Sequence, residues 1–98
     1  MEIKKNLNGT ELNVSVSGRL DTTTAPKLES EVGSCIDGIT SLVFDFKNLE
    51  YISSAGLRVL LALQKIMNKQ GTMKVINANE AILEIFEVTG FIDILTVE

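Results

Sequence analysis

Residues 42–71, LVFDFKNLEYISSAGLRVLLALQKIMNKQG, place a short apolar run ahead of a long amphipathic segment. The run Leu42–Phe46 is typical of a strand that is covered on both faces. A pair of serines before the amphipathic segment and Gly71 after it predict a helix that ends at about Gln70. A buried strand followed by a long helix favours an α/β fold.

Upstream of this stretch, the sequence predicts a hairpin. Ile3 and Leu7 mark a weak first strand, and Asn8-Gly9 is a dipeptide typical of hairpin turns. Strict alternation of apolar and polar residues then predicts a second, half-buried strand that Gly18 ends. Its apolar positions are Leu12, Val14 and Val16.

A first helix is expected after the threonines Thr22–Thr24, whose hydroxyls can cap it, with Pro26 in its first turn. Its apolar face comprises Ala25, Leu28, Val32, Cys35 and Ile36. The single cysteine is therefore interpreted as a core residue.

The C-terminal third predicts one more strand–helix–strand unit. Residues Met73–Ile76 form the strand, and Asn79 caps a helix that runs through Val88 and ends at Gly90. Residues Ile94–Val97 form the last strand. The whole order, β-β-α-β-α-β-α-β, predicts one α/β domain over residues 1–98, with a mixed, mostly parallel sheet flanked by helices.

Composition excludes several kinds of site. The 98 residues include no histidine and one cysteine, so Ser-His-Asp and Cys-His catalysis, histidine metal sites and disulfide pairing are all excluded. No P-loop and no GxGxxG motif is present. The acidic pairs Glu29/Glu31 and Glu84/Glu87 are interpreted as solvated helix positions. We expect no enzyme activity, no cofactor and no metal.

The charge and hydropathy patterns indicate a cytoplasmic protein. The net charge is −4 and no basic cluster is present, which argues against nucleic acid as a partner. No apolar run approaches the length that spans a bilayer, so direct membrane insertion is not expected. Residues 1–7 lack the apolar region of a signal peptide.

A helical wheel over the segment after Ser54 separates a core face from a polar face. The core face holds Val59, Leu60, Leu63, Ile66 and Met67, and the polar face holds Arg58, Lys65, Asn68 and Lys69. Leu57 and Leu61 fall within the polar arc. They are either isolated exposed leucines or part of a patch that docks a partner.

Ser53 and Ser54 lie where this helix begins, and either could be its cap. Unpaired backbone N–H groups and the helix dipole favour negative charge there. The serine pair is therefore either a structural cap or a regulatory, anion-accepting site. A phosphate on this turn would be compatible with the fold while changing the surface charge.

Three motifs carry a resemblance to a known family. Residues 45–57, DFKNLEYISSAGL, resemble the phosphorylation motif of bacterial anti-sigma factor antagonists, which are STAS domain proteins. Gly18-Arg19-Leu20-Asp21 resembles an earlier turn of that family, and residues 86–94 resemble its closing helix and strand. The resemblance implies that Ser54 is the phosphoacceptor, with Ser53 as the second candidate. It also implies a partner-binding surface near Asp21, Ser53, Gly56, Leu57, Arg58 and Leu61.

The resemblance further implies the partners. They are an anti-sigma serine kinase, from which the unphosphorylated protein releases a sigma factor, and a PP2C-type phosphatase. The chain departs from the family pattern at three places: Ser53 stands where aspartate is frequent, Ala55 where a hydroxyl residue is frequent, and Arg58 where glycine is frequent.

Two other functions remain open. Some STAS domains are accessory subunits of membrane transporters, including lipid-transport ATPases, and Ser53 in place of aspartate would fit an unphosphorylated subunit of this kind. A nucleotide or small-molecule sensor is the third reading, and the absence of phosphate-binding glycine loops argues against it.

Overall fold

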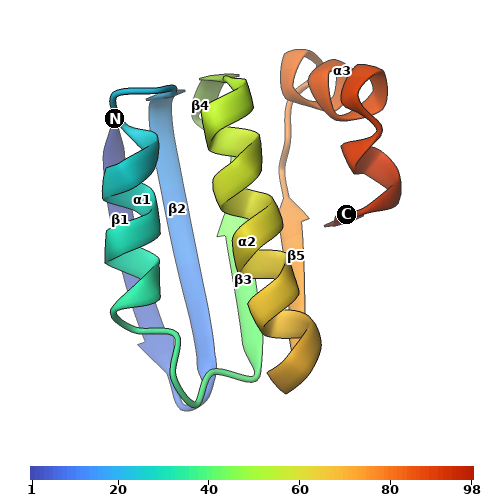
Figure 1. Cartoon of the computed structure of the whole chain (residues 1–98). Coiled ribbons are helices and arrows are strands. Elements are labelled where there is room, and N and C mark those ends of the chain that lie inside the picture. Colours follow the sequence, from blue (N-terminus) through green and yellow to red (C-terminus); the bar gives the residue numbers. More distant parts are fainter.

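The computed structural model describes all 98 residues (Figure 1). The first two strands of its sheet form the predicted hairpin. Strands β1 (Glu2–Asn8) and β2 (Glu11–Leu20) pair antiparallel, with Leu7 opposite Leu12. Gly9 has a φ of 65°, the left-handed conformation that a tight hairpin turn requires. The hairpin prediction is confirmed.

The remaining strands run parallel to their neighbours, which confirms a mixed, mostly parallel sheet. They are β3 (Ser41–Asp45), β4 (Leu49–Ile52), β5 (Thr72–Ile76) and β6 (Thr96–Val97). The order across the six-stranded sheet is β1-β2-β3-β5-β6, and β4 pairs with β2 beside this path. A helix connects β2 to β3, β4 to β5 and β5 to β6, as parallel strands require.

Strand β2 departs from the prediction that Gly18 ends it. The strand continues to Leu20 by changing partner: residues 11–15 pair with β3, and residues 18–20 pair with β4. The register shifts between Gly18 and Arg19, and Gly18 has a φ of 86°, which glycine adopts without strain. The element order is therefore β-β-α-β-β-α-β-α-β, with one strand more than the sequence predicts.

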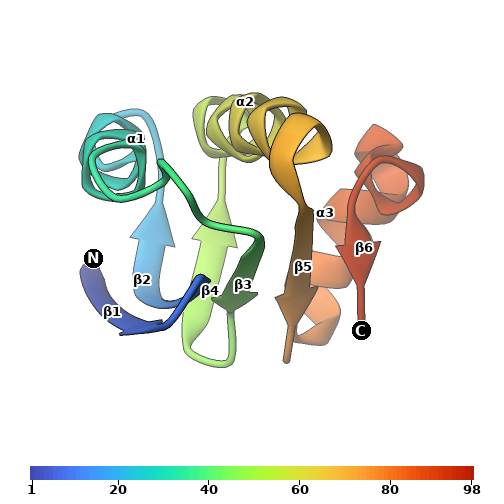
Figure 2. The same ribbon diagram turned by 90° about the horizontal axis from the view of Figure 1, so that it is seen from below.

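Two of the helices lie on one face of the sheet. Figure 2 shows α1 (Ala25–Gly33) and α2 (Ser54–Gln70) side by side on that face. Helix α3 (Glu80–Thr89) packs against β4 and against the 3₁₀ turn η1 (Phe91–Asp93). The predicted ends of α2, and Gly90 as the stop of α3, are confirmed. The N–H groups of Ile94 and Leu95 bond to the Phe91 carbonyl of η1, so β6 is shorter than the predicted strand.

The opposite face of the sheet carries no helix (Figure 2), yet β3 is buried on both faces, as predicted. Val43 alternates with the core residues Leu42 and Phe44, so it lies on this open face and is nevertheless buried. Its neighbours in register, Asn13 on β2 and Lys74 on β5, flank it and explain the burial. An apolar residue on a central strand can thus be shielded by the strands beside it.

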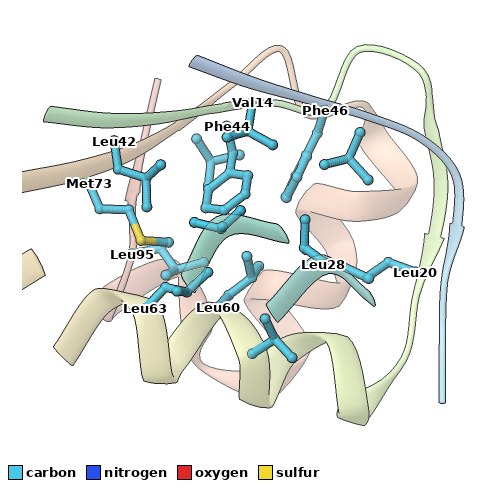
Figure 3. Packing of buried hydrophobic residues seen from close by; sticks show 14 of the residues in the cluster. Val14, Leu20, Leu28, Leu42, Phe44, Phe46, Leu60, Leu63, Met73 and Leu95 are labelled. Carbon is cyan, nitrogen blue, oxygen red and sulfur yellow. The ribbon is translucent and has the colours of Figure 1, made fainter. Parts of the chain in front are cut away.

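The core lies between the sheet and helices α1 and α2 (Figure 3). Phe44 of β3, Leu28 of α1 and Leu60 of α2 are fully buried there. The rings of Phe44 and Phe46 lie 5.6 Å apart at an interplanar angle of 41°, a favourable tilted arrangement. No helix of the chain combines the length and the apolar character that crossing a membrane demands.

Two residues predicted for the core lie at its edge or outside it. Ile66 of α2 is 40% exposed. Cys35 follows the end of α1, is half-buried, and has its Sγ 3.4 Å from Nζ of Lys5. A hydrogen bond from the Ser34 hydroxyl, and next that from Lys5, lower the pKa of this thiol.

Candidate functional site

The start of α2 is fixed by Ser53. Its backbone is extended, and its Oγ accepts a hydrogen bond from the Gly56 N–H at 3.4 Å, so Ser53 is the cap that the sequence left undecided. The Ser53 N–H donates to the Leu20 carbonyl at 2.8 Å. This bond ties the first turn of α2 to the end of β2. Ser54 is then the first residue of the helix.

The Ser54 side chain is exposed, and its hydroxyl takes part in no hydrogen bond within the protein. The first turn of α2 contains no acidic residue. The unpaired N–H groups and positive dipole end of the helix therefore face Ser54 without a competing negative charge. This arrangement leaves the Ser54 oxygen accessible as a nucleophile and favours an anion attached to it.

Two further residues near the start of α2 contribute to packing rather than to the exposed surface. Gly56 is buried, and a Cβ at this position would lie 2.8 Å from Ile52 Cγ1 and from Leu20 Cγ. Glycine thus lets α2 approach β2 and β4 closely. Leu57 is 6% exposed, so it is not the exposed leucine that its place in the polar arc indicated. The wheel describes α2 alone and could not include the rest of the hydrophobic core, to which Leu57 belongs.

Arg58 and Leu61 continue the α2 surface. Arg58 is exposed and forms no ion pair, and it lies four residues after Ser54 on the same side of the helix. Leu61 is half-buried. Arg58 is therefore a free cation close to the candidate phosphoacceptor.

Asp21 organises the turn between β2 and α1. Its Oδ1 accepts hydrogen bonds from the Thr23 hydroxyl at 2.7 Å and from the N–H groups of Thr23 and Thr24 at 3.0 and 3.2 Å. The Thr23 hydroxyl in particular holds the pKa of Asp21 below its usual value. Thr24 is the N-cap residue of α1 but caps no helical N–H with its side chain, so the predicted capping by a threonine hydroxyl is wrong. Asp21 instead closes the turn that precedes the helix.

Arg19 links this turn to β4. Its Nε lies 3.8 Å from Oδ2 of Asp21, and its guanidinium stacks 4.4 Å from the centre of the Tyr51 ring. Because Leu20 bonds to Ser53, Asp21 is one residue away from the anchor of α2. The fold thus brings residues 19–21 next to residues 51–58.

A groove lies between the start of α2 and α3, with a volume of about 410 Å³. We call it the α2–α3 groove; one side is lined by Tyr51, Ile52, Ser53, Ser54 and Leu57, and the other by Ala81, Glu84, Ile85, Val88 and Thr89. Sequence reasoning missed the α3 side, because only the fold brings it to the serines. The available signal was Val88, an apolar residue four positions after Glu84 and therefore on the same side of α3 as this acidic residue.

No three His, Cys, Asp or Glu side chains gather closely enough to hold a metal ion. The chain contains no histidine that could act as a base beside the Ser54 hydroxyl. An exposed hydroxyl at this position can accept a group such as a phosphoryl group.

Comparisons with known proteins agree with this geometry. A family model described as STAS domain matches residues 2–98. The chain is 29% identical to the anti-sigma-B factor antagonist of Bacillus subtilis over 98 residues, covering 99% of this chain and 88% of the relative. It is 36% identical over 84 residues to BtrV of Bordetella bronchiseptica, named as a candidate anti-sigma factor antagonist, covering 84% of this chain and 72% of the relative.

The fold is also similar to that of a solved protein. SpoIIAA of Bacillus, a cell fate determinant solved in its phosphorylated form, superposes with a TM-score of 0.78 at 14% sequence identity. The match covers 99% of this chain and 91% of SpoIIAA. The similarity confirms the predicted α/β architecture.

Proposed function

The chain belongs to the STAS domain family, and we propose that it is an anti-sigma factor antagonist that phosphorylation of Ser54 switches off. The observation that carries this proposal is the exposed, unbonded Ser54 hydroxyl at the start of α2. It occurs in a chain whose relatives are named antagonists of anti-sigma factors. In this role the protein binds partners and catalyses no reaction itself.

The proposed cycle has two partners in the cytoplasm. The unphosphorylated protein binds an anti-sigma factor that is also a serine kinase, and the sigma factor is released. The kinase then transfers a phosphoryl group: Oγ of Ser54 forms a bond to the γ-phosphorus of ATP, the bond to ADP breaks, and the hydroxyl proton leaves. A PP2C-type phosphatase hydrolyses the phosphate ester and restores the hydroxyl.

Ser54 is favoured over Ser53 by its surroundings. The Ser53 oxygen is half-buried and already accepts the Gly56 N–H, whereas Ser54 is exposed. A phosphate on Ser53 would displace the cap of α2, while a phosphate on Ser54 would lie beside the helix N-terminus and within reach of Arg58. That a related fold accepts a phosphate is supported by SpoIIAA, whose phosphorylated form has been solved.

The charge of one phosphate is sufficient for the switch. Phosphoserine carries about −1.5 to −2 charges at pH 7. Two like unit charges 4 Å apart repel by about 4 kcal/mol at an effective dielectric constant near 20. A hundredfold loss of affinity needs only about 2.7 kcal/mol. A phosphate that faces the nucleotide phosphates of the kinase can therefore end binding without a conformational change.

The test uses the cognate anti-sigma serine kinase, which is to be sought first among the genes beside that of this protein. Incubation with that kinase and ATP should add one phosphate to the wild-type protein, located at Ser54 by peptide mass spectrometry. Ser54→Ala should accept no phosphate and still bind the kinase. Ser54→Asp should bind about a hundredfold more weakly. Ser30→Asp, which places the same charge on the exposed surface of α1, is the matched control.

Two results would contradict the proposal. One is a phosphate found on a residue other than Ser53 or Ser54. The other is copurification with a transporter ATPase without any kinase-dependent modification, which would instead indicate an accessory subunit of a membrane transporter.

A further inference from the structure

We propose that the α2–α3 groove receives an apolar side chain of the serine kinase, flanked in the kinase by a basic residue, and that this contact aligns the kinase on Ser54. The inference rests on the proposed function and adds a docking surface to it. Figure 1 shows why the groove and Ser54 can act together, since α3 lies at the same end of the sheet as the start of α2.

The groove is continuous with the phosphoacceptor. Ser53 and Ser54 line it on the α2 side, and Ile85 and Val88 line it on the α3 side. A protein that brings ATP to the Ser54 oxygen must therefore cover the groove as well. This continuity favours the kinase as the occupant over an unrelated small molecule.

The apolar character of the groove calls for an apolar group from the partner. Val88 is 80% exposed, more than any other large hydrophobic side chain that the surface displays. Ile85 is half-buried on the same side of the groove, and Tyr51 adds a partly exposed aromatic ring on the other side. Covering these side chains would remove apolar area from water, which is the usual driving force at the centre of an interface.

The two sides of the groove differ in charge, and this difference specifies the partner further. Helix α3 contains Glu80, Glu84 and Glu87, has no basic residue, and forms no ion pair. Of these, Glu84 lines the groove. The α2 side offers the positive end of a helix without an acidic residue in its first turn.

A complementary partner therefore presents opposite charges to the two sides. Its anionic group, the ATP phosphates, faces the start of α2, and a lysine or arginine faces Glu84 on α3. A kinase that is loaded with nucleotide offers both groups, whereas a second copy of this chain that docks through its own α3 would place one acidic helix against another. The charge pattern thus favours the kinase over self-association.

The test measures binding of the full-length protein to the same kinase, loaded with a non-hydrolysable ATP analogue. Val88→Glu should weaken binding at least about tenfold, because it places a charge in the apolar groove. Glu84→Lys should weaken it as well, because it reverses the charge on the α3 side. Both residues are exposed, so both variants should fold.

Two matched controls separate the groove from general charge effects. Leu7→Glu adds the same charge at another exposed apolar residue, on β1, and Glu29→Lys makes the same reversal on α1. Each should change affinity less than twofold. Circular dichroism of all four variants checks that the fold is retained.

The outcomes distinguish this inference from the proposed function. If the kinase binds the wild type and both groove variants equally, the groove is not its docking site, although the antagonist function stands. If the kinase fails to bind the wild type, the proposed function itself fails. Concentration-dependent dimerisation that Val88→Glu abolishes, without any effect on kinase binding, would assign the groove to a second copy and overturn the inference.

Discussion

Helices α1 and α2 begin in similar places and yet differ in what their first turns leave free. Each starts after a strand at the same end of the sheet, and the two starts are joined through Leu20. At α1, Asp21 accepts hydrogen bonds from Thr23 and Thr24, and the Thr24 hydroxyl donates to the Arg19 carbonyl. At α2, the Ser53 cap is followed by Ser54, whose hydroxyl has no partner.

The comparison shows that a helix N-terminus alone does not make a site. Both starts have a positive dipole end. The start of α1 is occupied by its own carboxylate, whereas the start of α2 has no acidic residue and an accessible oxygen. The two turns differ in whether their polar groups are free to bind another molecule.

The largest expected difference between α1 and α2 is in how a glycine-to-alanine substitution changes stability. Gly56→Ala should lower the free energy of unfolding by about 1–3 kcal/mol, because the added Cβ would overlap Ile52 and Leu20. The matched change in α1, Gly33→Ala, meets no atom within 4 Å and should raise stability by about 0.5–1 kcal/mol. Urea denaturation of both variants measures the difference, and equal signs would refute a close approach that is specific to α2.

A smaller effect is expected from the serine pair. Ser53→Ala should destabilise the protein by about 0.5–1 kcal/mol, because the Gly56 N–H loses its acceptor. Ser54→Ala removes a hydroxyl that bonds to nothing, so its effect should stay within about 0.5 kcal/mol. Thermal denaturation of the two variants compares them. A larger cost for Ser54→Ala would reverse the assignment of cap and free hydroxyl.

The smallest effect concerns acid stability at the start of α1. Thr23→Val should raise the pKa of Asp21, because it removes the hydrogen bond that contributes most to lowering it. The folded protein binds the Asp21 proton less tightly than the unfolded chain does. Asp21 therefore stabilises the fold at neutral pH, and this contribution is lost as the pH falls through the lowered pKa.

An NMR titration of the Asp21 carboxyl measures that pKa directly. Thr22→Val is the control, since Thr22 is exposed and its hydroxyl makes no hydrogen bond. An Asp21 pKa that is the same in the wild type and in Thr23→Val would contradict the account of a closed first turn.

Local patterns predicted the parts of the fold that depend on neighbouring residues. The hairpin at Asn8-Gly9 and the end of α2 at Gly71 follow from turn and cap chemistry, which acts within a few residues. Strand β4 was missed because only Leu49 and Ile52 of its four residues are buried, a three-residue spacing that lacks the alternation of a half-buried strand. Its pairing with β2 depends on the distant Gly18.

The candidate site was likewise predictable only where it depends on residues that are close in the sequence. Ser54 and Arg58 could be placed on one helix by sequence spacing, and both lie on its surface. The burial of Leu57 and the α3 side of the groove depend on elements far apart in the chain. A helical wheel treats all surroundings as equal and therefore cannot anticipate which side of α2 its neighbours cover.

The stacking of Arg19 on Tyr51 has a practical consequence. The chain contains one tyrosine and no tryptophan, so Tyr51 dominates its intrinsic ultraviolet fluorescence. This ring lines the groove beside the serines. The protein thus carries an optical reporter at the surface where recognition is proposed, and the fluorescence of an unlabelled sample is sensitive to a molecule that binds there.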